Sequence, residues 1–224
     1  MYDRSQMQIS MPFTPVVKGL MIANISIWFF LQVIVEHLGG VKWTPFFALQ
    51  PLAAVTQGYI WQWLTYMFLH SIDWTHIVFN MLMLWWLGAD LEKRWGGRGF
   101  LAFYLTTGVG AGFLYSLGVV GYSYITGNLA PAAVSVVGAS GALFGLMLAF
   151  GILFGERIVH FMMIFPMKAK HFVMVLGAIQ VVALMTSGVV GSGVSYLAHL
   201  TGLVSGFIYL WVWGRLRRNG RTKQ

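Results

Sequence analysis

Long apolar segments recur along the chain and are separated by more polar connections. They predict helices at residues 18–36, 75–92, 98–119, 137–154, 170–188 and 194–213. About 20 apolar residues are enough for a helix to cross a bilayer core, and a helix satisfies its own backbone hydrogen bonds in lipid. Apolar positions do not alternate with polar ones, as they would in the strands of a membrane barrel. The pattern therefore predicts an all-α polytopic membrane protein, a compact bundle of six transmembrane helices.

The connection at residues 37–74 is long and rich in aromatic side chains. These are Trp43, Phe46, Phe47, Tyr59, Trp61, Trp63 and Tyr66. Aromatic residues favour the membrane–water boundary, so we expect an interfacial first loop that contains short helices. The alternative, a structureless external loop, fits less well because such loops are uncommon in compact domains. The chain then divides into a leader at 1–17, a six-span domain at 18–213 and a basic tail at 214–224.

Composition agrees with lipid as the main solvent. The chain is 58% hydrophobic and 9% charged, with a mean hydropathy of +0.74, whereas a soluble domain is about one quarter charged. There is no cysteine, which excludes disulfides, zinc–thiolate sites and a cysteine nucleophile. The first apolar run lacks a small-residue cleavage site and further spans follow it, so we interpret it as a retained helix rather than a signal peptide.

The formal net charge is +8, and the placement of the basic residues explains it. Except for Lys42, every lysine and arginine lies at or before the start of the first span, between the second and third, between the fourth and fifth, or after the sixth. In a six-span chain these positions share one side of the membrane, which is the positive-inside pattern. Both termini are therefore expected in the cytoplasm, and no nucleic-acid partner is needed.

The fourth segment carries the sequence Gly138-Ala-Ser-Gly141, which places one hydroxyl, Ser140, among small residues. Small residues let helices approach closely, and taken alone this packing role is the commoner one. Gly138, however, permits a non-helical turn before the serine. A helix that begins at Ser140 would have free N–H groups there, and these stabilise an oxyanion that forms beside the hydroxyl.

The last segment carries one imidazole, His199, followed by Gly202 and Gly206. Spacings of three and four place these residues on one helix face. One interpretation is that His199 has a structural role and hydrogen-bonds a neighbouring helix. This face, however, also suits close packing against other small residues. The fourth segment offers them at Gly138, Gly141 and Gly145. Such packing would bring His199 to Ser140, where it could act as the base that a serine nucleophile needs.

His76 and Asn80 in the second segment are four residues apart and share a face. Both can donate hydrogen bonds to a carbonyl oxygen with developing charge, so they are candidates for an oxyanion hole together with the Ser140 N–H. The alternative is a metal or purely structural role. No metal and no other cofactor is predicted, because two histidines fall short of the three protein ligands usual at catalytic zinc.

The outer halves of the spans contain no Asp or Glu, so a Ser-His-Asp triad has no obvious third member. We therefore predict a dyad of Ser140 and His199, with the imidazole oriented by packing rather than by a carboxylate. Phe144 lies four residues after Ser140 on the same face and could lie against the ring.

These motifs together resemble the rhomboid family of intramembrane serine proteases. The resemblance covers about residues 60–213 and is carried by G-x-S-G at Gly138–Gly141, A-H-x-x-G-x-x-x-G at Ala198–Gly206 and H-x-x-x-N at His76–Asn80, in the family's order. It implies Ser140 as nucleophile, His199 as general base and acid, and an oxyanion hole of His76, Asn80 and the Ser140 backbone.

The resemblance also bears on three supporting positions. Phe144 stands where the family often has a tyrosine stacked on the histidine. Glu92 is expected to contribute polar contacts between helices at the cytoplasmic end. Trp61-Gln62 stands where the family often has Trp-Arg, and the loss of the arginine predicts a looser first loop.

The implied function is hydrolysis of peptide bonds in or next to transmembrane segments of membrane-protein substrates, in a lipid bilayer and of the bacterial inner-membrane type. Two alternatives stay open. A catalytically silent rhomboid-like protein would bind transmembrane helices without cutting them, but silent relatives usually lack the serine or the histidine, and both are present here. A channel or transporter would show polar stripes along several spans, and these are scarce. The natural substrate and the oligomeric state are not legible from the sequence.

Overall fold

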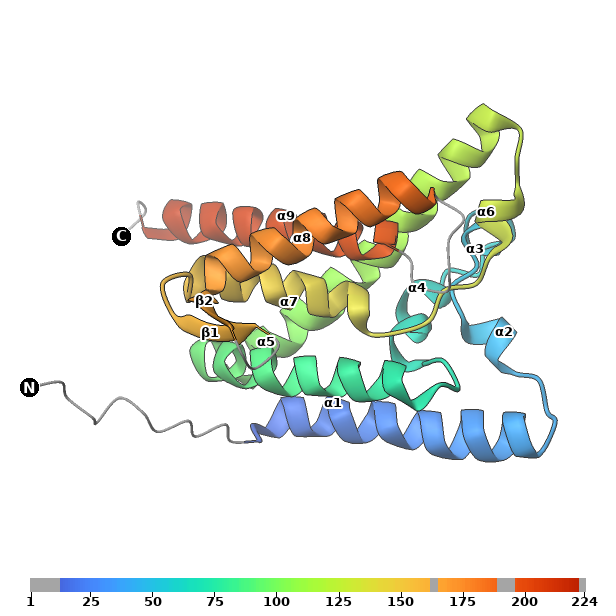
Figure 1. Cartoon of the computed structure of the whole chain (residues 1–224), viewed down its shortest axis with the longest axis horizontal. Helices are drawn as coiled ribbons and strands as arrows, with labels where there is room; N and C mark the ends of the chain where they lie inside the picture. The colour runs from blue at the N-terminus through green and yellow to red at the C-terminus, as the bar shows by residue number, and fades with distance from the viewer. Residues whose placement is uncertain (1–12, 162–164, 189–195, 222–224) are drawn as a thin grey trace, which may run out of the picture.

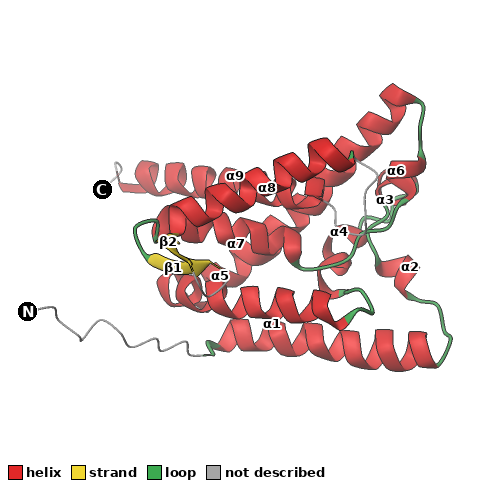
Figure 2. Ribbon diagram, viewed as in Figure 1, coloured by secondary structure: helices red, strands yellow, loops and turns green. Residues whose placement is uncertain are grey.

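A computed structural model describes residues 13–161, 165–188 and 196–221. Residues 1–12 of the expected leader, 222–224 of the tail and all of the expected connection 189–194 lie outside this range. Most of the described chain is helical. The elements are α1 Pro15–Ser26, the π-helix η2 Ile27–Leu38, α2 Thr44–Phe47, α3 Pro51–Thr56, α4 Gln62–Thr65, the 3₁₀-helix η3 Tyr66–Phe68, α5 Trp74–Thr126, α6 Ala130–Ala133, α7 Ser140–Leu153, β1 Ile158–Phe161, β2 Phe165–Lys168, α8 Ala169–Ser187 and α9 Tyr196–Arg221. Helices α1, α7 and α9 run roughly along the long axis of the molecule, and the later part of α5 crosses it obliquely (Figures 1 and 2).

Four stretches in the described chain are long and apolar enough to cross a membrane. They are Pro15–Leu38, Trp74–Thr126, Ala169–Ser187 and Tyr196–Leu216. Within α5, Gly96 has φ 74° and ψ 161°, a conformation that favours glycine, so the helix divides into two arms at 74–95 and 97–126. α7 is apolar but has 14 residues. Six crossings are reached only if α7 and each of the two arms of α5 cross the membrane, in addition to Pro15–Leu38, α8 and α9. The number six therefore stays a prediction.

The structure differs from the sequence prediction in three places. The fold is not entirely α-helical, because the connection 155–169 contains the antiparallel hairpin of β1 and β2. Its first strand, Ile-Val-His-Phe, has β-branched and aromatic residues that favour strands, and Pro166 in the second disfavours a helix. In addition, α7 begins at Ser140 rather than at residue 137, and the second arm of α5 continues to Thr126 rather than ending at 119.

The charged connections gather at one end of the bundle. The start of α1, the hairpin and the end of α9 all lie there (Figure 1). Arg157, just before β1, forms an ion pair with Asp90 of α5, and Glu156 forms ion pairs with Lys168 and Lys170. This shared end is what the distribution of basic residues predicts for spans that alternate in direction.

Glu92 fastens α1 to this end of α5. Its carboxylate is buried and accepts hydrogen bonds from the Thr14 hydroxyl at 2.5 Å, the Val16 N–H at 3.0 Å and the Val17 N–H at 2.9 Å. The first N–H groups of a helix have no partner within the helix. Glu92 supplies that partner for α1, and it is the polar contact between helices that was expected at this position.

The first loop is folded into the short helices α2, α3, α4 and η3, as the aromatic pattern predicts. Gln62 is buried; its side chain donates to the Phe46 carbonyl at 3.1 Å and accepts from the Gln50 N–H at 3.0 Å. Leu49 then pairs with Val136 through two backbone hydrogen bonds of 3.0 and 2.8 Å. The loop therefore supports the segment that leads into Ser140.

The centre of the molecule is formed by α5, α7 and α9, which pack against one another. Glycines mark the closest approach of α7 and α9. A Cβ added at Gly206 would lie 2.9 Å from the Gly145 Cα, and one added at Gly202 would overlap the Gly141 carbonyl oxygen. The two small-residue faces thus meet backbone to backbone, and this contact sets the geometry of the residues at the start of each helix.

Candidate active site

Ser140 is the first residue of α7. The turn before it depends on Gly138, which has φ 125° and whose N–H donates to the Tyr66 carbonyl at 2.9 Å. A Cβ at Gly138 would lie 2.9 Å from Nε2 of His76. A side chain there would be strained and would crowd His76, so glycine brings the turn, the serine and the histidine together. At the beginning of a helix the backbone N–H groups are free to bind an anion.

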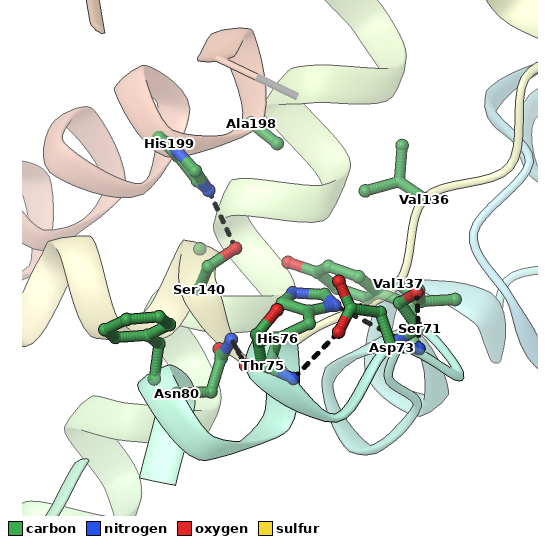
Figure 3. A pocket seen from close by; sticks show the side chains of 13 residues that line it. Ser71, Asp73, Thr75, His76, Asn80, Val136, Val137, Ser140, Ala198 and His199 are labelled. Atoms are coloured by element: carbon green, nitrogen blue, oxygen red, sulfur yellow. Dashed lines mark hydrogen bonds between the residues drawn. The ribbon is translucent and has the colours of Figure 1, made fainter. Parts of the chain in front are cut away.

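His199 faces Ser140 from α9. Its Nε2 lies 2.9 Å from the Ser140 Oγ (Figure 3), and the imidazole is buried. The Phe144 ring stacks on the imidazole with a centroid separation of 4.3 Å and an angle of 11° between the planes. The structure therefore brings together three predicted residues from two helices, with a hydrogen bond between hydroxyl and imidazole.

Gln180 of α8 also contacts the imidazole, and the sequence prediction missed it. Its Oε1 lies 2.8 Å from Nδ1 of His199. Packing was expected to orient the ring in place of a carboxylate, and the structure adds a hydrogen-bond partner from a third helix that this expectation did not include. The signal was present: a polar side chain inside a span needs a partner. The partner of the imidazole need not be a carboxylate, because an amide oxygen accepts the same hydrogen bond.

His76 lies at the start of α5, beside the turn at Gly138. Its Nδ1 accepts a hydrogen bond from the Ser71 N–H at 3.1 Å. In a neutral imidazole the other nitrogen then carries the proton, so Nε2–H is a donor close to Gly138. Asn80 lies one turn later, and its Nδ2 donates to the His76 carbonyl at 2.8 Å. One hydrogen of that amide group is used in this way, and the second is left to donate elsewhere.

These side chains line one cavity of about 440 Å³. Ser140, His199, His76 and Asn80 contribute its polar wall, and Phe79, Val136, Val137 and Ala198 contribute apolar surface (Figure 3). Asp73 lies at the exposed rim, where hydrogen bonds from Thr75, first from its backbone N–H, lower the pKa of the Asp73 carboxyl below its usual value. The cavity can therefore admit water, and the polar backbone of a bound polypeptide, to the Ser140 hydroxyl and the His199 imidazole. Among the described residues, no three His, Asp or Glu side chains are grouped closely enough to hold a metal ion.

The part of the chain that contains the candidate site is similar to known proteins. Residues 57–216 match the model of the Rhomboid domain. The chain is 30% identical over 156 residues to the protein YdcA of Bacillus subtilis (strain 168), whose name assigns it provisionally to the rhomboid proteases; the match covers 69% of this chain and 67% of that protein. It is also 30% identical over 131 residues to proteins named rhomboid protease GlpG from Yersinia pestis (strain Pestoides F) and Yersinia pseudotuberculosis serotype O:3 (strain YPIII), over 52% of this chain and 45% of each relative.

Proposed function

This chain belongs to the rhomboid family, and on that premise we propose that it is an intramembrane serine endopeptidase with Ser140 as nucleophile and His199 as general base. One observation carries the proposal: the 2.9 Å contact between the Ser140 Oγ and Nε2 of His199, made by residues 59 positions apart in the sequence. A separation of this size is within the reach at which a base takes the proton of an attacking hydroxyl.

In the first half of the reaction the Ser140 Oγ attacks the carbonyl carbon of the scissile peptide, and its proton passes to Nε2 of His199. The same proton then goes to the leaving amine, which departs as the new N-terminus. In the second half a water molecule attacks the acyl-serine ester. His199 takes a proton from that water and returns it to Ser140, which releases the new C-terminus.

The negative charge on the carbonyl oxygen is stabilised by three donors in this proposal. They are the backbone N–H of Ser140, the Nε2–H of His76 and the second hydrogen on Nδ2 of Asn80. The hydrogen bond from Ser71 supports this assignment because it leaves the His76 proton on the nitrogen near the Gly138 turn. Such donors are most effective when they are held in place before the charge develops.

The substrates are membrane proteins cut in or next to a transmembrane segment. The apolar spans place the enzyme in a bilayer, and the charge distribution supports a topology with both termini in the cytoplasm. Because the compared relatives are bacterial, we assign it to the bacterial inner membrane. In that topology the cavity opens toward the outer face, from which water reaches Ser140.

A fluorophosphonate probe tests the proposal directly. It should label the wild-type protein in liposomes and fail to label Ser140→Ala, while Ser205→Ala, which removes a hydroxyl from α9 outside the cavity, should be labelled normally. A transmembrane substrate should be cut by the same variants that are labelled. If the folded wild-type protein is neither labelled nor active, a helix-binding role without catalysis replaces this proposal.

A further inference from the structure

We propose that Gln180 is a positioning residue that holds His199 in the tautomer with its proton on Nδ1 and keeps Nε2 directed at Ser140. The catalytic consequence rests on the proposed function. The hydrogen bond and its effect on the imidazole do not, and they can be tested separately.

The geometry determines where the proton lies. Both ring nitrogens of His199 are engaged, Nδ1 with the Gln180 Oε1 at 2.8 Å and Nε2 with the Ser140 Oγ at 2.9 Å. A neutral imidazole has one donor and one acceptor, and an amide oxygen only accepts. Nδ1 therefore donates to Gln180, and Nε2 offers its lone pair to the Ser140 hydroxyl. This is the tautomer that a general base needs.

Phe144 and Gln180 restrict different motions of the ring. The parallel stacking of Phe144 holds the plane of the imidazole, but a ring can still turn within that plane. A hydrogen bond to Nδ1 opposes this in-plane rotation, because turning the ring would break it. When Nε2 takes the serine proton the ring becomes positive, and the bond to the amide oxygen becomes charge-assisted and stronger.

The position of Gln180 on α8 supports a specific role. The buried residues of α8 are Ala169, Phe172 and Val173 near its start, and then only Gln180 in its second half. Gln180 is 8% exposed, whereas its neighbours Ile179 and Val181 are 47% and 44% exposed. A buried amide is unfavourable unless it is hydrogen-bonded. A neutral acceptor also avoids the larger penalty of a carboxylate in this setting.

The test compares Gln180→Met, which keeps the length of the side chain but removes the amide, with Gln180→Glu, which keeps an accepting oxygen in either charge state. Ile179→Met is the matched control on the exposed face of α8. In Gln180→Met, kcat and the rate of fluorophosphonate labelling should fall by about 10- to 100-fold, the size expected for one hydrogen bond to a charged transition state. KM should change little, Gln180→Glu should recover most of the loss, and Ile179→Met should resemble wild type.

The tautomer is read by nitrogen NMR of histidine-labelled protein, with the His199 signals assigned by their absence in His199→Ala. Wild type and Gln180→Glu should show a protonated Nδ1 and an unprotonated Nε2, and Gln180→Met should lose this single tautomer. Wild-type kcat or an unchanged tautomer in folded Gln180→Met would overturn the inference. A wild type that shows the tautomer and loses it in Gln180→Met, but neither cleaves nor is labelled, would support the inference and refute the proposed function.

Discussion

The contact between α7 and α9 gives a prediction for Gly202→Ala, a change that adds one methyl group away from the reacting atoms. The new Cβ would lie 3.2 Å from the Gly141 Cα and would overlap its carbonyl oxygen. Neither atom belongs to a side chain that can rotate away, so the helices must separate by on the order of 1 Å to restore an ordinary contact. Overpacking of this kind costs about 1–3 kcal/mol of stability.

The same separation acts on the reacting pair, because Ser140 begins α7 and His199 lies one turn before Gly202 on α9. The distance between the Ser140 Oγ and Nε2 of His199 is 2.9 Å, and an added gap of about 1 Å would exceed hydrogen-bond reach. Displacement of that size can reduce a rate by about 100-fold. We therefore expect Gly202→Ala to lower kcat on a transmembrane substrate by about 100-fold and to lower the thermal unfolding temperature.

Gly214→Ala is the control, since it is the same substitution in the same helix and its Cβ would meet nothing within 4 Å. It should keep wild-type kcat and unfold at the same temperature or slightly higher, because alanine favours a helix. Both quantities are measured in liposomes, with labelling by fluorophosphonate to count competent sites. A Gly202→Ala protein that cleaves at the wild-type rate would refute the argument that backbone contact sets the distance between Ser140 and His199.

Two further predictions concern residues outside the helix contact. Each of the variants His76→Ala and Asn80→Ala should lower kcat by about 100-fold or more with little change in KM, as expected for a lost oxyanion donor. Steady-state kinetics measure both constants. An unchanged kcat would show that the replaced residue is not part of the oxyanion hole. Replacing Glu92 by alanine leaves three donors at the start of α1 without an acceptor, which should destabilise the protein by about 1–3 kcal/mol. The unfolding temperature should fall while kcat per labelled site stays near wild type. Unchanged stability would show that water replaces the carboxylate.

Much of the candidate site follows from the sequence because polar residues inside apolar segments are few. Ser140 and His199 each stand among glycines at helical spacing, and close packing is the arrangement that both patterns favour. The first loop was predictable for a similar reason, since its aromatic residues disfavour a structureless chain. Hydrophobic periodicity could not predict a side-chain contact between two helices whose polar residues share no spacing. Gln180 on α8 and its partner on α9 have no common spacing, and a single polar residue does not say which helix it faces.

The departure at Gln62 can be followed in the structure through the hydrogen bonds of its side chain. The missing arginine predicted a looser first loop. A guanidinium, however, only donates hydrogen bonds, while an amide both donates and accepts. In the structure Gln62 uses both functions, toward the Phe46 carbonyl and the Gln50 N–H, and is buried. One neutral side chain thus joins two parts of the loop without a buried charge that would need a partner. Gln62 therefore joins α4 to the 46–50 segment of the loop through backbone groups of that segment.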